Sequence, residues 1–363
     1  MNVGNAVTRA TRKLRQSVAR AAGVAALASA ALLGSAVGTP AQAQEKMQLT
    51  VAEAIRWIGF LPLYVANDKG FFARENLDVK IVTAGGRALA VQTVISGQAD
   101  LSSQDPAGPT QALKQGADVR IFLPLINRNL IYMVGPKGAA EGDKMDPRGM
   151  RIAVATPPSS PHNVLTHFLR EKGFEEVDRA TWRPKGSTNP KDQVRLMFVG
   201  FFQELPPVSA GQADAAVVLT PYEAIGVHDV GLKVLYSWAE ASGPFALTVF
   251  SASQERLKSK QPAFQAFTNA MTKAYDWMYA NPGETADIAA KYFPKLNPVV
   301  VKEAAGRMLR EGAVPRNGIV PKDGYQANIF GLAARAGDPG ANVPYEQAVV
   351  TEFGERATKG AAK

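Results

Sequence analysis

The sequence predicts an α/β protein of two lobes, each built on a parallel or mixed sheet flanked by helices, with a hinge between them. Two observations support this prediction. The tetrapeptide GQAD occurs at residues 97–100 and again at 211–214, each time after a helical pattern and before a short apolar run. Each apolar run ends in a residue–proline pair that suits the first turn of a new helix, Asp105-Pro106 and Thr220-Pro221. Such helix–strand–helix units build parallel sheets with right-handed crossovers.

Each GQAD copy begins where a helix is expected to end. Gly97 and Gly211 are predicted to take the left-handed conformation that closes a helix. From the order of the segments we predict a first lobe over residues 44–134 and a second lobe over 135–242. Residues 243–363 then return to the first lobe and supply C-terminal helices. Two passages between the lobes would form a hinge that suits closure around a ligand.

The N-terminus is predicted to be an export signal covering residues 1–43. Its first 20 residues contain five basic side chains and no acid, a small apolar stretch follows, and Ala41-Gln42-Ala43 fits a cleavage site. We expect cleavage near Ala43 and a periplasmic location, with an uncleaved membrane anchor as the alternative. The five basic residues account for more than half of the net charge of +9, so that charge does not indicate nucleic-acid binding.

The sequence lacks the residues and motifs that several kinds of catalytic, cofactor and metal sites require. The chain has no cysteine, which excludes disulfides, thiol nucleophiles and thiolate-bound metals. No G-x-S-x-G, P-loop or G-x-G-x-x-G motif is present, so we expect neither catalysis nor a cofactor. The three histidines, His162, His167 and His228, are not spaced as metal ligands on one helix face, and we expect no metal site.

The segment from residue 151 to residue 173 contains the strongest candidate site. A strand is predicted to lead into a helix that has Ser160 as its N-cap and Pro161 as its first residue. The N–H groups of Ser160, His162 and Asn163, with the hydroxyls of Ser159 and Ser160, would then bind a small oxyanion. The commoner alternative is a capped helix without a ligand.

The first lobe offers further candidates near its strand ends. Trp57 and Phe60 follow the first strand and would either line a pocket or belong to the core. Asp105 would either meet an ammonium or hydroxyl group of a ligand or cap its own helix. Three arginines in this lobe could bind an oxyanion in bidentate fashion: Arg56, Arg87 and Arg128.

Taken together, these segments resemble the periplasmic substrate-binding proteins of ABC importers for aliphatic sulfonates, taurine and nitrate. That group is related to the pyrimidine-precursor synthase. The resemblance rests on residues 59–82, the two GQAD elements, residues 157–174 and the helical region from residue 261 to residue 293. It implies a type II periplasmic-binding-protein fold, no enzymatic activity, a small-molecule ligand and a monomer. Its partner would be a permease of the inner membrane with its ATPase.

The same resemblance implies which residues line the ligand cleft. They are Ser159, Ser160 and His162 in the second lobe, and Ser102, Ser103, Gln104 and Asp105 in the first. Thr220 stands where the sulfonate and taurine proteins have tryptophan, and Pro157-Pro158 where they have glycine. Residues 196–208 are also longer and more aromatic than in that group. These departures suit a larger, partly apolar or aromatic ligand.

The leading functional hypothesis is therefore a solute-binding component that captures a small organic anion, either sulfonate-like or an aromatic carboxylate. One alternative ligand is a thiamine-precursor pyrimidine or another heteroaromatic compound. Another alternative is a periplasmic ligand sensor of the same fold. An enzyme of the pyrimidine-synthase type would need a cysteine-rich motif, which this chain lacks.

Overall fold

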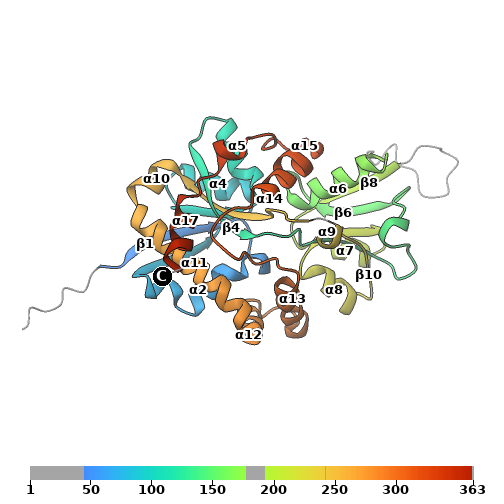
Figure 1. Ribbon diagram of the computed structural model, residues 1–363. Helices are drawn as coiled ribbons and strands as arrows, with labels where there is room; N and C mark the ends of the chain where they lie inside the picture. Colours follow the sequence, from blue (N-terminus) through green and yellow to red (C-terminus); the bar gives the residue numbers. More distant parts are fainter. Residues whose placement is uncertain (1–44, 177–192, 242, 362–363) are drawn as a thin grey trace, which may run out of the picture. The chain divides into compact units, whose positions relative to one another are not determined.

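The computed structural model describes residues 45–176, 193–241 and 243–361, so the predicted signal segment lies outside the described residues. Two mixed sheets organise the chain (Figure 1). The first has the order β2-β1-β3-β11-β4. Strand β1 is parallel to β2 and β3, whereas β11 is antiparallel to β3 and β4. The bounds are β1 Met47–Glu53, β2 Leu77–Thr83, β3 Leu101–Gln104, β4 Val119–Ile126 and β11 Thr248–Ser253.

The second sheet has the order β10-β5-β9-β6-β8-β7 and repeats the same plan. Strand β6 is parallel to β8 and β9, and β5 is antiparallel to β9 and β10. The α/β prediction of two mixed sheets is thus confirmed. The bounds are β5 Ile131–Gly135, β6 Arg151–Ala155, β7 Glu175–Glu176, β8 Gln193–Val199, β9 Ala215–Leu219 and β10 Lys233–Ser237.

The chain passes between the sheets twice, at residues 127–130 and 238–247. The sequence boundary at residue 134 put most of β5 in the first lobe, but β5 pairs with β9 and β10 in the second sheet. Its apolar residues would suit either sheet, so only the pairing shows where it belongs. The chain returns to the first sheet at β11, which begins at Thr248.

Helices cover both faces of the second sheet. Helix α6 (Ser160–Glu171) lies on one side of β6, and α8 (Tyr222–His228) lies on the other with α7 (Leu205–Ser209) (Figure 1). Strand β9 is buried along its whole length. Val217 packs in the core that contains Val164 of α6, and Val218 packs in the core of the α7 and α8 side. An apolar run of this kind is typical of a strand covered on both faces.

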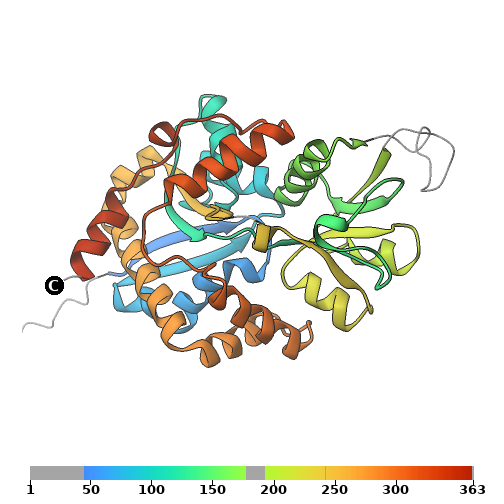
Figure 2. The same cartoon turned by 45° about the vertical axis from the view of Figure 1, so that its right-hand side comes forward.

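The first sheet is enclosed by the early helices and by segments from the C-terminal third of the chain, coloured orange to red in Figure 2. Phe264, Phe267 and Met271 of the 20-residue helix α11 are fully buried against this sheet. The early elements are η1 Ile58–Phe60, α2 Leu61–Asp68, α3 Phe71–Arg74, α4 Arg87–Ile95 and α5 Ala107–Lys114.

The remaining helices lie in the second lobe, in the second passage and in the late part of the chain. They are η2 Gly142–Lys144, α9 Trp238–Ala241, α10 Gln254–Ser259, α11 Gln261–Ala280, α12 Pro282–Tyr292, α13 Pro298–Arg310, α14 Lys322–Gln326, the π-helix η3 Ala327–Leu332, α15 Ala333–Ala336, α16 Tyr345–Ala348 and α17 Glu352–Ala361. No helix among the described residues is long and apolar enough to span a membrane.

The glycines of the two GQAD copies behave as predicted. Gly97 has φ +75° and Gly211 has φ +67°, the left-handed conformation that favours glycine. Each glycine follows the last turn of a helix, α4 and α7 respectively. The repeated tetrapeptide therefore marks the same helix-to-strand turn in both lobes.

The aspartate that ends each GQAD copy, Asp100 or Asp214, has the same structural role in both lobes. Asp100 accepts the Thr50 backbone N–H at 2.8 Å and the Lys260 ammonium at 2.8 Å. Asp214 accepts the Arg151 backbone N–H at 2.7 Å and the Arg151 side chain at 3.0 Å. Asp100 thus joins the start of β3 to the middle of its parallel neighbour β1, and Asp214 joins the start of β9 to the start of its parallel neighbour β6. The repeat is a structural device at the sheet edge opposite the strand ends where a ligand is expected.

We predict that Asp214→Asn lowers the free energy of unfolding at pH 7 by about 1–2 kcal/mol, allowing for its partial exposure. Although burial opposes ionisation, hydrogen bonds from Arg151 hold the pKa of Asp214 below its ordinary value. The stabilisation is therefore present above that ordinary value and is lost as the pH falls through the lowered pKa.

Urea denaturation at pH 7 and at about pH 3 would measure the effect. The exposed Asp229→Asn is the matched control and is expected to change stability little. An equal loss for Asp214→Asn at both pH values would contradict a contribution from the ionised carboxylate.

Candidate functional site

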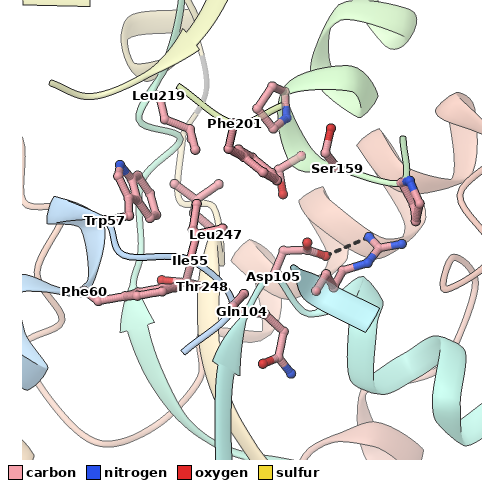
Figure 3. A pocket seen from close by; sticks show the side chains of 15 residues that line it. Ile55, Trp57, Phe60, Gln104, Asp105, Ser159, Phe201, Leu219, Leu247 and Thr248 are labelled. Carbon is pink, nitrogen blue, oxygen red and sulfur yellow. Dashed lines mark hydrogen bonds and ion pairs between the residues drawn. The ribbon is translucent and has the colours of Figure 1, made fainter. Parts of the chain in front are cut away.

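A small cavity lies between the two sheets, where strands β1, β3, β6 and β9 end; we call it the inner cavity. Its volume is about 40 Å³, measured as the space open to the centre of a water molecule. That is room for about three waters or one small chemical group. Figure 3 shows apolar side chains on one side, among them Trp57, Phe60 and Leu219, and the polar Asp105 and Ser159 on the other. The carboxyl edge of parallel strands is the usual ligand position in such sheets.

The start of α6 forms part of the polar side. Ser159 is the N-cap: its hydroxyl oxygen accepts the His162 N–H at 3.3 Å, and its hydroxyl donates to the Ala155 carbonyl at 3.0 Å. The predicted cap, Ser160, is therefore wrong by one residue. Ser160 is the first helical residue and Pro161 the second, a position that also needs no backbone N–H.

This shift changes which backbone donors are free. The His162 N–H donates to the Ser159 hydroxyl oxygen, and the Asn163 N–H donates to the Ser159 carbonyl at 3.0 Å. Only the Ser160 N–H, of the three expected donors, has no acceptor among the described residues. The structure therefore offers a ligand one N–H and the Ser160 hydroxyl at this helix start, rather than three N–H groups.

His162 points away from the inner cavity. Its imidazole contacts the Thr166 hydroxyl at 3.3 Å and lies 5.8 Å from the Phe198 ring, and it is not among the cavity-lining residues. The other two histidines contact acids elsewhere: His167 lies 3.4 Å from Glu171, and His228 lies 3.6 Å from Glu303. No metal-ligand cluster occurs among the described residues.

The turn after β3 contains a buried ionic network. Arg87 contacts Asp105 at 3.1 Å and Asp338 at 2.9 Å, and the Asn163 amide donates to Asp338 at 2.8 Å (Figure 3 shows the Asp105 contact). Asp105 also accepts the Ala107 N–H at 3.0 Å, so it caps α5, one of the two roles considered for it. Asn163 belongs to α6, and the network therefore joins the two lobes.

The pKa values of the two carboxylates of this network are shifted in opposite directions. Burial raises the pKa of Asp105, and the nearby Asp338 adds to that effect although Arg87 opposes it. Burial also opposes ionisation of Asp338, but Arg87 and Asn163 hold its pKa below the ordinary value. One guanidinium thus balances two acids, and Arg87 brings no surplus positive charge to the inner cavity.

The other two arginine candidates lie outside the inner cavity. Arg128 donates to the Glu311 carbonyl at 3.2 Å. The Arg56 guanidinium stacks 4.2 Å from the Tyr64 ring centre and lies 3.5 Å from the Glu53 carboxylate. Neither arginine is available to an anion in that cavity.

The polar residues of β3 mostly hold the sheet together. Ser102 and Ser103 are fully buried, and the Ser102 hydroxyl bonds to that of Ser251 on β11 at 3.1 Å. The Gln104 amide donates to the same Ser251 hydroxyl at 3.0 Å. Of these strand residues only Gln104 lines the inner cavity, together with Asp105.

Trp57 and Phe60 belong both to the core and to the cavity wall. They are 2% and 1% exposed, and their rings meet edge to face at 5.6 Å. The Trp57 indole N–H donates to the Thr220 carbonyl across the lobes. Thr220 does not line the cavity, and its hydroxyl donates to Glu223 at 3.0 Å.

Sequence reasoning missed the apolar walls of the cavity. These are Ile55, Phe201, Leu219 and Leu247. The aromatic richness of residues 196–208 was the available signal for Phe201.

The same segment contains Glu204, which is 2% exposed and has a carboxylate oxygen without a hydrogen-bond partner among the described residues. Burial raises the pKa of Glu204 to about 7.

Comparison with known families identifies one match: the NMT1/THI5-like family model matches residues 57–285. A curated relative is YtlA of Bacillus subtilis (strain 168), which is named as a binding protein without a stated ligand. It is 23% identical over 87% of this chain and 92% of its own length.

Solved structures show the same fold. A Bordetella bronchiseptica RB50 protein has a TM-score of 0.67 and 24% identity over 88% of this chain and 99% of its own. The alkanesulfonate-binding protein SsuA from Xanthomonas axonopodis pv. citri, bound to MOPS, has a TM-score of 0.61 and 18% identity over 81% of this chain and 94% of its own. These likenesses identify the two-sheet architecture as the periplasmic-binding-protein fold.

We predict that Glu204→Gln makes the protein more stable than the unchanged chain at pH 8, by about 1–3 kcal/mol, and gives a smaller gain at pH 5. A raised pKa means that the folded state binds the proton more tightly. Stability therefore falls as the pH rises from the ordinary glutamate value through about 7. Glutamine removes that loss because it stays neutral.

Urea denaturation at both pH values measures the difference, with the exposed Glu240→Gln as control. A Glu204→Gln protein with the same pH dependence as the unchanged chain would contradict the assignment of the titration to Glu204.

Proposed function

Because the chain belongs to the NMT1/THI5-like family, we propose that it is the solute-binding component of an ABC importer in the periplasm. It captures a small organic ligand between its two lobes and delivers it to a permease of the inner membrane. The observation that supports this most directly is the inner cavity, which residues of both lobes line at the ends of the parallel strands. The binding-protein relatives point the same way.

We propose binding without catalysis. The residues that line the inner cavity include no histidine or lysine. The Ser159 hydroxyl donates to the Ala155 carbonyl, so no side-chain base activates it. A nucleophilic serine needs such a base within hydrogen-bond distance.

The ligand head would bind between Ser160 and Asp105. Ser160 supplies an N–H and a hydroxyl, and Asp105 supplies a carboxyl group; both belong to the polar side of the inner cavity. An anion such as a sulfonate or aromatic carboxylate would use the Ser160 donors. A heteroaromatic compound such as a thiamine-precursor pyrimidine would also donate a hydrogen bond to Asp105. The balanced charge of Arg87 with two acids favours the heteroaromatic ligand, and the walls of Trp57, Phe60 and Phe201 suit a flat ring.

The first test is a thermal-shift screen of residues 44–363 against sulfonates, taurine, nitrate, aromatic acids and pyrimidines. A ligand that binds the folded state raises the melting temperature by mass action. We then expect Ser160→Ala to weaken binding of the responding ligand by about 0.5–2 kcal/mol, the worth of one or two hydrogen bonds. Ser259→Ala, far along the chain at the end of α10, is the matched control. An unchanged dissociation constant for Ser160→Ala would remove the α6 start from the site.

We also predict that the bound ligand brings the lobes together. The chain crosses between the sheets at two places, which is the geometry of a hinge. Small-angle scattering should show a smaller radius of gyration at saturating ligand than without it. Equal radii in the two conditions would contradict ligand-driven closure.

A further inference from the structure

A second and larger cavity lies beside the inner one; we call it the outer cavity. Its volume is about 300 Å³ by the same measure, within the range of small-molecule sites. Four separate segments line it. They are residues 56–58 after β1, residue 202 and residues 221–222 of the second lobe, and residues 292–296, from the end of α12 to the stretch before α13.

Trp57 lines both cavities and separates them. Its indole N–H donates to the Thr220 carbonyl of the other lobe, so the ring is held in place between the two spaces. Apart from Trp57, the lining residues of the outer cavity are all different from those of the inner cavity.

Aromatic side chains form the walls of the outer cavity. Phe202 and Tyr222 stack with ring centres 4.8 Å apart and planes at 20°, and Tyr292 and Phe293 line the same space. Phe202 has φ +68°, an unfavourable conformation for a bulky residue. Such local strain is concentrated at binding sites, where it holds a side chain in a required position.

The charged residues that line the outer cavity are both basic, Arg56 and Lys295. The Arg56 guanidinium lies 3.5 Å from Glu53, which receives a shorter bond of 2.7 Å from Thr83. Lys295 is exposed and has no ion-pair partner among the described residues. The aromatic walls alone would also suit an organic cation, but two basic residues with no lining acid disfavour one.

We propose that the outer cavity is a second binding site, for an aromatic carboxylate. The ring of the ligand packs against Phe202 and Tyr222, and its carboxylate lies toward Arg56 and Lys295. An aromatic body matches the walls, and a negative group matches the two cations. This site goes beyond the proposed function, because it shares none of the polar groups of the inner cavity.

Benzoate is the probe, and titration calorimetry of residues 44–363 is the measurement. We expect Tyr222→Leu, which keeps apolar volume but removes the ring, to weaken benzoate binding about three- to tenfold. Lys295→Gln should weaken it about two- to fivefold, the worth of an exposed ion pair. Phe330→Leu and Lys258→Gln are the matched controls, since both residues are exposed elsewhere on the chain.

Two further ligands test whether the outer cavity requires both a negative charge and an aromatic ring. Benzyl alcohol lacks the charge and cyclohexanecarboxylate lacks the flat ring, and each should bind more weakly than benzoate. If Tyr222→Leu does not fold, Phe202→Leu tests the same wall, because leucine removes the other ring of the stack.

Ser160→Ala distinguishes the two cavities. Benzoate binding that is weakened by Tyr222→Leu and Lys295→Gln but not by Ser160→Ala supports the second site. Binding that is lost in Ser160→Ala and unchanged in the other two variants overturns it while leaving the proposed function intact. No measurable binding of benzoate at millimolar concentration also overturns it, and a responding ligand in the thermal-shift screen would still support the proposed function.

Discussion

Each sheet of this protein is completed by a strand that the chain supplies as it crosses between the lobes. The chain leaves the first sheet after β4 and enters the second as β5, antiparallel to β9. It returns as β11, which pairs antiparallel to β3. Both crossing segments are therefore anchored at one end in the middle of a sheet. The proposed closure would therefore bend the chain at the stretches between these strands. This constraint places both cavities, because the carboxyl ends of the parallel strands face each other across the crossings.

The inner cavity and the outer cavity differ in their electrostatics. In the inner cavity a buried arginine is balanced by Asp105 and Asp338, and the free hydrogen-bonding groups come from the start of α6. In the outer cavity the lining residues bring basic groups without a lining acid, and the walls are aromatic. The two spaces share one wall, Trp57, yet they select for different chemistry.

Local sequence rules predicted the features that depend on neighbours along the chain. The left-handed glycines, the α/β alternation and the turn at Asp105 depend on residues a few positions apart, and the structure has them. The cap of α6 was wrong by one residue because Ser159 and Ser160 are equally good caps, and proline is accepted at either of the first two helical positions. Features set by distant residues could not be predicted: Arg87 is paired with an acid 251 positions away, and β5 joins a sheet that its own residues do not specify.

Among the contacts that join the lobes in the described part of the chain, three lie close to the cavities. They are the bonds of Trp57 to Thr220, of Asn163 to Asp338, and of Arg307 to Glu223 at 3.1 Å. The second-lobe partners lie at the start of α6 or just around the start of α8, where the strands of that sheet end.

Glu223 is deeply buried, and burial raises its pKa to about 7 although Arg307 opposes the rise. Separating the lobes would break its ion pair but would also return the carboxylate to water. These two effects oppose each other, so this pair stabilises the closed arrangement only modestly. For the ligand-driven closure proposed above, what fills the space around Trp57 therefore matters more than this ion pair.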